Sequence, residues 1–381
     1  MSRVPMHCSA APAGKERQRG FTLIEMMIAV TISLLIMTAV LTLYLNLSRS
    51  NDEMAKTNSL IENGRFAIQV FQEDLAHAGF WNGFIPQFDD LTLNTVPADV
   101  PTAMPPVCTA FSAWTAQDKI NAIGVPVQAY DAVPSGCSAI VTNKVANSDV
   151  LLVRHADTCS PGVGNCDALS AGKVYFQPSF CSTETTTPYV LDSTGFVLHQ
   201  RNCSTLADRR KYVSNLYYLR NYAVTAGDGI PTLMRSQFDT TGGASPDNVQ
   251  QAAVPLIEGI EAFRIEFGID NRSKTGATVD YTSAVSWADP STKATPTNRG
   301  DGASDGNFIH CSACTQDQMM NAVEAKIYVL VRSRDATPGY TSSNTYNLGS
   351  LTLGPFSDGY KRHLFTSSAT LMNVSRRRQT P

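Results

Sequence analysis

The sequence predicts an α+β protein in which a long N-terminal α-helix packs on a large, mainly antiparallel β-sheet domain with long loops. Residues 21–47 form one apolar run, and residues 49–78 contain no proline and keep a helical spacing of apolar side chains. Beyond residue 80, apolar and polar residues alternate with the period of two that strands have. One long helix followed by many strands is typical of the α+β class.

The composition limits the classes of partner. The 381 residues are 43% hydrophobic and 17% charged, so that the chain can bury a sizeable core. The formal net charge is −3, but residues 1–20 contain four basic residues and one acidic residue, so that residues 21–381 carry −6. Because phosphate binding needs a basic surface, this balance argues against nucleic acid. The one basic cluster, at residues 376–378, is expected to be a solvated C-terminal tail.

The run at residues 21–47 predicts the transmembrane half of the long helix. A helix of this length spans roughly 40 Å, which is enough to cross a bilayer with some tilt. Lys15, Arg17 and Arg19 precede it, and positive flanks favour a cytoplasmic N-terminus with an exported C-terminal body. An ordinary secretory signal peptide is excluded, because the run is too long and no A-x-A-like cleavage site follows it.

Glu25 is the one formal charge in this run. An unpaired carboxylate inside a membrane costs about 2.5–3.5 kcal/mol at a helix centre, so that Glu25 should have a partner. Cleavage between Gly20 and Phe21 would create a free α-amine near the same depth. The amine and the carboxylate could then pair between neighbouring subunits that are staggered along a fibre. The alternative is a plain anchor helix in which Glu25 has no role.

The junction GFTLIE at residues 20–25 resembles the class III signal of type IV prepilins and pseudopilins. The resemblance implies that residues 1–20 are a leader, that a membrane peptidase cuts after Gly20, and that Phe21 is then N-methylated. It also implies a role for Glu25 in fibre assembly.

The helix is expected to continue through residues 48–79 as an amphipathic half outside the membrane. Its apolar stripe should pack under the body as core and not serve as a ligand site. The stripe consists of Gly64, Ala67, Ile68, Phe71, Leu75 and Ala78. Gly79 and the aromatic residues 80–84 should end the helix.

The globular body is expected at residues 80–381. Strands are predicted at 149–154, 173–177, 211–223, 230–236, 263–267, 323–332 and 361–374, with a hairpin of residues 189–191 and 196–198. Residues 94–108 and 270–307 should be long loops.

Four segments of the body are similar, in order, to the PilW family of type IV pilus minor pilins. They are residues 62–81, 256–270, 323–334 and 358–373. The resemblance implies a minor pilin that takes part in initiation and assembly of type IV pili. No cofactor is expected. Its implied partners are other minor pilins, the major pilin, the prepilin peptidase, the inner-membrane assembly platform, membrane lipid and a tip adhesin. The implied location is the bacterial inner membrane, with a periplasmic body, and then the pilus.

Two alternative functions stay open. One is a J-type pseudopilin of a type II secretion system. The other, of a different class, is a tip-located binding or adhesion module that acts through the cysteine-rich region at about residues 95–215.

The cysteines favour disulfides in an oxidising compartment. Cys8 lies in the leader, and an even set of eight follows the apolar run. Eight cysteines allow 105 pairings, among which the short-range pairs Cys159 with Cys166 and Cys311 with Cys314 are favoured. The eight are Cys108, Cys137, Cys159, Cys166, Cys181, Cys203, Cys311 and Cys314.

No enzyme class, catalytic residue or metal site is supported by the motifs. Cys311 and Cys314 have redox spacing, but they end a polar loop and lack a thioredoxin-like setting, so that a structural disulfide is favoured over a membrane-tethered oxidoreductase. Zinc at His310 would need a second ligand pair, and the acidic loop at 300–307 lacks EF-hand spacing. Four other histidines lie apart along the sequence, at His77, His155, His199 and His363.

Overall fold

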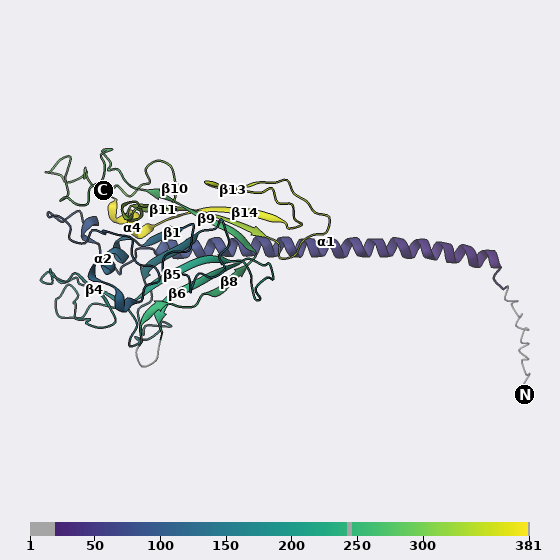
Figure 1. The fold of residues 1–381 in the computed structure, drawn as a ribbon, viewed down its shortest axis with the longest axis horizontal. Helices are drawn as coiled ribbons and strands as arrows, with labels where there is room; N and C mark the ends of the chain where they lie inside the picture. The colour runs from purple at the N-terminus through teal and green to yellow at the C-terminus, as the bar shows by residue number, and fades with distance from the viewer. Residues whose placement is uncertain (1–19, 242–245, 380–381) are drawn as a thin grey trace, which may run out of the picture. The chain divides into compact units, whose positions relative to one another are not determined.

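The computed structural model describes residues 20–241 and 246–379. The chain forms two compact units, of which the first ends at Ala55 and the second begins at Lys56. One continuous helix, α1 (Leu23–His77), begins in the first unit and ends in the second. The predicted α+β class is confirmed, because strands arranged in sheets follow this helix (Figure 1).

The larger sheet of the second unit has eight strands in the described residues, and all of its pairs are antiparallel. Its order is β1-β2-β5-β3-β4, and β6 joins β5 to β7 and β8. The strands are β1 (Val127–Tyr130), β2 (Val150–Ala156), β3 (Tyr175–Pro178), β4 (Tyr189–Asp192), β5 (Arg210–Arg220), β6 (Thr232–Thr240), β7 (Asn248–Gln250) and β8 (Val254–Glu258).

The smaller sheet has the order β10-β9-β11-β14 and is also antiparallel. Its strands are β9 (Ile260–Ile269), β10 (Ile309–His310), β11 (Ala322–Arg332) and β14 (Arg362–Thr370). A separate hairpin of β12 (Tyr346–Leu348) and β13 (Leu351–Leu353) packs beside it. The short helices are η1 (Gln87–Asp89), η2 (Phe111–Ala113), α2 (Ala116–Gly124), α3 (Gln316–Met320) and α4 (Met372–Arg378).

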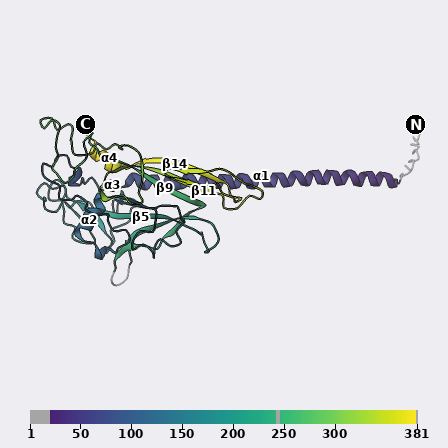
Figure 2. The same ribbon diagram turned by 45° about the horizontal axis from the view of Figure 1, so that its top comes forward.

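Within the second unit, the last turns of α1 lie between the two sheets (Figures 1 and 2). The Phe71 ring contacts Tyr217 of β5 at 5.5 Å and Phe263 of β9 at 5.0 Å between centroids. The predicted apolar stripe is confirmed as core, with Ile68 partly buried and its other members buried. Gly64 permits close contact with β14, because a Cβ there would lie 2.1 Å from the Phe365 ring.

Most predicted strands are confirmed, but the hairpin at 189–198 is wrong. β4 pairs with β3 instead, in a register that sets Phe176 opposite Leu191. Both side chains thereby enter a second apolar cluster around Trp81 and Tyr212. Hydrophobic contact with distant residues of this cluster therefore favours this pairing over the one that local turn residues predict.

The C-terminal predictions also need correction. The strand expected at 361–374 ends at Thr370, and α4 follows it. The arginines at 376–378 are not a solvated tail, since only Arg376 is exposed and Arg378 is 2% exposed. Arg378 lies within ion-pair distance of Asp89 and Asp270, which are also buried. Buried carboxylates far away in the sequence therefore hold this cluster inside the body.

The polar segment between β9 and β10 is irregular, as predicted, but its backbone is tied to carboxylates. Asp270 accepts hydrogen bonds from the backbone of Asp301 and Gly302, and Asp305 accepts one from Arg272. One carboxylate beside the acidic loop at 300–307, that of Asp270, and one within it, that of Asp305, are thus directed at backbone N–H groups. Over the residues that the structure describes, no group of three or more His, Cys, Asp or Glu side chains could hold a metal ion.

Candidate functional site

Helix α1 begins with a reciprocal cap formed by Thr22 and Glu25. Oε2 of Glu25 accepts hydrogen bonds from the Thr22 backbone N–H at 2.9 Å and from the Thr22 hydroxyl at 2.8 Å. The Thr22 Oγ1 in turn accepts the Glu25 N–H at 3.3 Å. This is a capping box, in which the N-cap and the third helical residue satisfy each other's backbone donors. The spacing of a threonine three residues before a glutamate would have predicted it.

The capping box leaves part of the Glu25 carboxylate available. Both bonds from Thr22 reach Oε2, and Oε1 accepts no hydrogen bond from the described residues. The donors at Thr22 are neutral, so that the formal charge of the carboxylate is not compensated locally. A cation placed at Oε1 would therefore still lower the free energy of Glu25 in a membrane.

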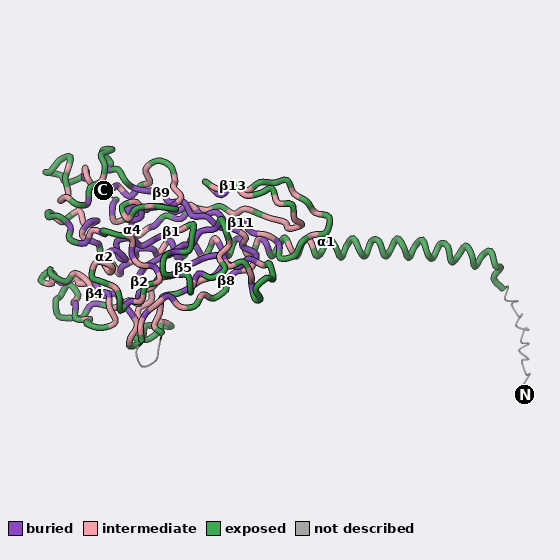
Figure 3. Tube along the Cα trace, viewed as in Figure 1, coloured by how far each residue is buried: buried purple, intermediate pink, exposed green. Residues whose placement is uncertain are grey.

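The part of α1 that ends at Leu47 presents apolar side chains on all sides. Every described residue from 20 to 52 is exposed, and the Phe21 side chain is 90% exposed (Figure 3). In the described residues, α1 is one helix that is long and apolar enough to cross a membrane. A helix that is apolar on all faces needs either lipid or other apolar helices around it.

In the second unit, a buried polar cluster ties α1 to the larger sheet. Nε2 of His155, on β2, lies 3.1 Å from Oδ1 of Asp74, and the Asn215 amide donates to both oxygens of Asp74 at 3.0 and 3.1 Å. The other nitrogen of His155 lies 2.8 Å from the carbonyl oxygen of Ala156. Because both ring nitrogens face acceptors, the pair of His155 and Asp74 holds a proton between them.

The pKa of His155 is shifted by two opposing effects. Burial by itself lowers the pKa, but the hydrogen bond to Asp74 and the charge of Asp74 outweigh burial and raise it above its ordinary value. Sequence reasoning did not find this cluster, and it treated His77 and His155 as separate although their rings lie 5.6 Å apart. The available signal was the position of Asp74, which is three residues after Phe71 and therefore on the same helix face.

The C-terminal end of α1 is capped by side chains of α4. The Asn373 amide donates to the carbonyl oxygens of Ala76, His77 and Ala78 at 3.1, 3.3 and 3.2 Å. Arg377 donates to the carbonyl of Gly79 at 3.0 Å. These bonds satisfy carbonyls that a helix end leaves without partners.

The eight cysteines of the body form four disulfides in the structure, which include the two short-range pairs that the spacing favoured. Cys311 of the CxxC segment is 2% exposed, and His310 bonds to Asp149 at 3.0 Å. This CxxC pair thus lies in a packed strand-to-helix connection. The four pairs are Cys108–Cys137, Cys159–Cys166, Cys181–Cys203 and Cys311–Cys314.

Comparisons with known proteins give a family match for the N-terminal segment and another for the second half of the body. Residues 15–41 match the family model of the prokaryotic N-terminal methylation motif, and residues 216–373 match that of Type IV Pilus-assembly protein W. Among solved structures, a type IV-like pilin, TTHA1219 from Thermus thermophilus, aligns over 83% of this chain and 96% of its own, with 11% sequence identity and a TM-score of 0.32. No curated protein gives a significant match.

The methylation motif at the start of an apolar helix that leads into a sheet body defines a type IV pilin-like protein. Its body carries the PilW domain, and the resemblance to the PilW family of type IV pilus minor pilins is confirmed.

Proposed function

We propose that this protein is a minor pilin that takes part in initiating and assembling type IV pili. Residues 1–20 are the leader, which is removed after Gly20, and Phe21 becomes the methylated first residue. Residues 21–47 hold the subunit in the inner membrane, with the N-terminus in the cytoplasm. Residues 48–79 continue the helix outside the membrane, and their apolar stripe from Gly64 to Ala78 packs in the periplasmic body of residues 80–381. The leader residues 1–19 lie outside the described part of the structure.

The observation that carries the proposal is the incomplete pairing of Glu25 in the otherwise uncharged apolar run of residues 21–47. The local cap uses Oε2 and leaves Oε1 without a partner in the described residues. Removal of the leader would create a cation, the Phe21 amine, and a neighbouring subunit in a fibre could bring that cation to Oε1. Other minor pilins and the major pilin are the partners that could supply it, while the prepilin peptidase and the assembly platform act before incorporation. The family description, which names pilus assembly, favours this function over a secretion pseudopilin.

The test compares two substitutions that separate charge from capping. Glu25→Gln keeps a capping-box side chain but removes the charge, whereas Glu25→Val removes both. If the charge serves assembly, both variants should insert, lose the leader and form disulfides normally, yet both should reduce surface fibres and the recovery of partner pilins. Fibre counts and pull-downs in cells that carry only the variant would measure this.

The control is Ile24→Val, which changes the neighbouring apolar residue and should leave fibre number unchanged. Normal assembly by Glu25→Gln alone would assign Glu25 to helix capping. Normal assembly by both Glu25 variants would contradict the proposal.

A further inference from the structure

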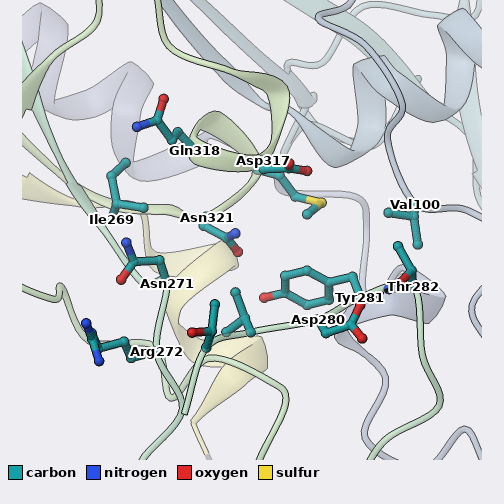
Figure 4. Close-up of a pocket in the computed structure, with 13 residues that line it drawn as sticks. Val100, Ile269, Asn271, Arg272, Asp280, Tyr281, Thr282, Asp317, Gln318 and Asn321 are labelled. Atoms are coloured by element: carbon teal, nitrogen blue, oxygen red, sulfur yellow. Dashed lines mark hydrogen bonds between the residues drawn. The ribbon is translucent and has the colours of Figure 1, made fainter. Parts of the chain in front are cut away.

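A cavity of about 450 Å³ lies in the second unit, outside the contacts that involve α1. It opens between the segment that follows β9, the segment 278–282 and helix α3 (Figure 4). Its volume falls within the range of small-molecule sites, which is roughly 300–1,000 Å³. Of the cysteine-rich region, at about 95–215, only Val100 lines it.

The lining combines planar amides with apolar surface. Asn271, Gln318 and Asn321 supply side-chain amides, and Ile269 and Met320 supply apolar contacts. Asn271 has both a donor and an acceptor in one plane, which suits two adjacent hydroxyl groups of a ligand. The amide oxygen of Gln318 already accepts from the Thr315 N–H at 3.0 Å, and that of Asn321 accepts from Arg378 at 2.7 Å, so that these two amides offer their N–H groups. The apolar side chains suit the C–H groups of the same ligand.

Two buried polar groups of the lining have hydrogen-bonding capacity that the described residues do not use. Tyr281 is 5% exposed, and its hydroxyl is buried without a hydrogen-bond partner in that part of the chain. Figure 4 shows this hydroxyl pointing toward Asn321 and the interior of the cavity. Asn321 is 3% exposed; its Oδ1 accepts from Arg378 at 2.7 Å, while its amide nitrogen makes no bond to a described residue. Buried polar groups normally have partners, so that unused ones facing a cavity indicate a ligand.

The charges of the lining select against a strongly charged ligand. Arg272 and two aspartates, Asp280 and Asp317, face the cavity, so that both signs are present. The Asp280 carboxylate already accepts bonds from Thr282 and Ser283, and Arg272 donates to the Gly276 carbonyl at 3.2 Å. An anion would meet Asp317 and a cation would meet Arg272, and neither would find full compensation.

We propose that this cavity binds a neutral, hydroxyl-rich ring, namely a hexopyranose unit of a glycan. Tyr281 and Asn321 donate from the floor, Asn271 and Gln318 bind hydroxyls at the rim, and the apolar residues contact the C–H face of the ring. The inference concerns a binding activity of the body and does not rest on the proposed role in pilus assembly.

The test is binding of methyl hexopyranosides to the full chain, held in a detergent that contains no sugar. Methyl glucopyranoside, galactopyranoside and mannopyranoside are titrated singly and followed by isothermal calorimetry and ligand-observed NMR. Tyr281→Phe removes the hydroxyl and keeps the ring that packs on Phe88 at 5.6 Å. It should weaken binding of the preferred sugar by about tenfold. The same variant should leave the unfolding temperature of the empty protein unchanged or raise it, because the hydroxyl has no partner to lose.

Tyr212→Phe is the matched control, because the Tyr212 hydroxyl is also buried without a partner in the described residues but lies in the second apolar cluster, around Trp81, and not in the cavity lining. It should not change binding. Asn271→Ala, at an exposed position of the rim, should weaken binding without affecting folding. The proposal is overturned if none of the three sugars binds, if a charged sugar such as N-acetylneuraminic acid binds as well as they do, or if Tyr281→Phe and Asn271→Ala both bind like the unmodified chain.

Discussion

Arg378 connects distant parts of the body through a single buried guanidinium group. Its Nε donates to Asp89 at 2.9 Å, its Nη1 to Asn321 at 2.7 Å, and its Nη2 to the Met320 carbonyl at 2.9 Å. Asp89 is 4% exposed and also accepts a bond from Arg377 at 3.1 Å. Removing one member of such a buried group leaves an uncompensated charge, which is costly.

Arg378→Met should therefore lower the free energy of unfolding by about 3–5 kcal/mol. Arg376→Met, which changes an exposed arginine of the same helix, should change it by less than about 0.5 kcal/mol. Denaturant titration of the full chain in detergent would measure both. Equal effects of the two substitutions would show that the ion pairs of Arg378 do not stabilise the body.

His155 should make the stability of the body depend on pH. Its pKa is raised in the folded protein by Asp74 despite burial, so that the folded state binds the proton more tightly than the unfolded state does. The contribution is therefore complete below the unfolded pKa of about 6.5 and is lost as the pH rises through the folded pKa. The stability difference between the unmodified protein and His155→Leu should be largest in acid and should shrink above neutral pH.

Thermal unfolding of both proteins across this range would show the trend. A His155→Leu difference that grows as the pH rises would contradict the assignment.

At the scale of elements, helix α4 connects the end of α1 to the acidic loop at 300–307. Helix α4 caps α1 through Asn373, and its Ser375 hydroxyl donates to the Gly302 carbonyl at 2.7 Å. Gly302 has a φ of +82°, and a Cβ there would lie 2.3 Å from the Ser375 carbonyl oxygen. The acidic loop therefore needs a glycine at this position both for its backbone and for its contact with α4.

Gly302→Ala should thus destabilise the body more than Gly306→Ala does. Gly306 also has a positive φ, of +75°, but a Cβ there would meet nothing within 4 Å. The control should cost about 1–2 kcal/mol from the backbone alone, and Gly302→Ala should add about 1–3 kcal/mol for the forced contact. Similar unfolding free energies for the two variants would argue against the close docking of α4 on this loop.

For the whole molecule, the disulfides and the helix divide the chain into chemically different parts. The described cysteines all lie in the second unit and are paired there, whereas Cys8 belongs to the predicted leader and lies outside the described residues. Disulfides persist in oxidising compartments. Export of the second unit, with retention of the leader in the cytoplasm, would agree with this division.

The mature protein should begin at Phe21, carry a methyl group on that residue, and contain no free thiol. Intact mass after alkylation without reduction should therefore show no adduct, while the uncleaved precursor should gain one adduct at Cys8. Reduction before alkylation should add eight. A mature mass that starts at Met1, or adducts at Cys311 and Cys314 without reduction, would contradict the processing or the disulfide assignment.

The sequence by itself determined the long helix, its apolar half, the stripe that packs as core, most strands and the α+β class. These features depend on local periodicity, which can be recognised within a single segment. Examples are the helical spacing of the apolar stripe that includes Phe71 and the alternation of apolar and polar residues in β11. The prepilin-like junction at residues 20–25 could also be predicted from the sequence, because the cleavage site and Glu25 lie within six consecutive residues.

Only the tertiary structure decided which segments meet. It paired β4 with β3, buried Arg378 against Asp89, joined Asp74 to His155, and placed Tyr281 at the floor of a cavity. A local pattern states that a residue is polar, but whether that residue reaches solvent depends on partners tens or hundreds of positions away. The free energy of burying a charge or a hydroxyl is set by those partners, and the packing of the two sheets around α1 supplied them.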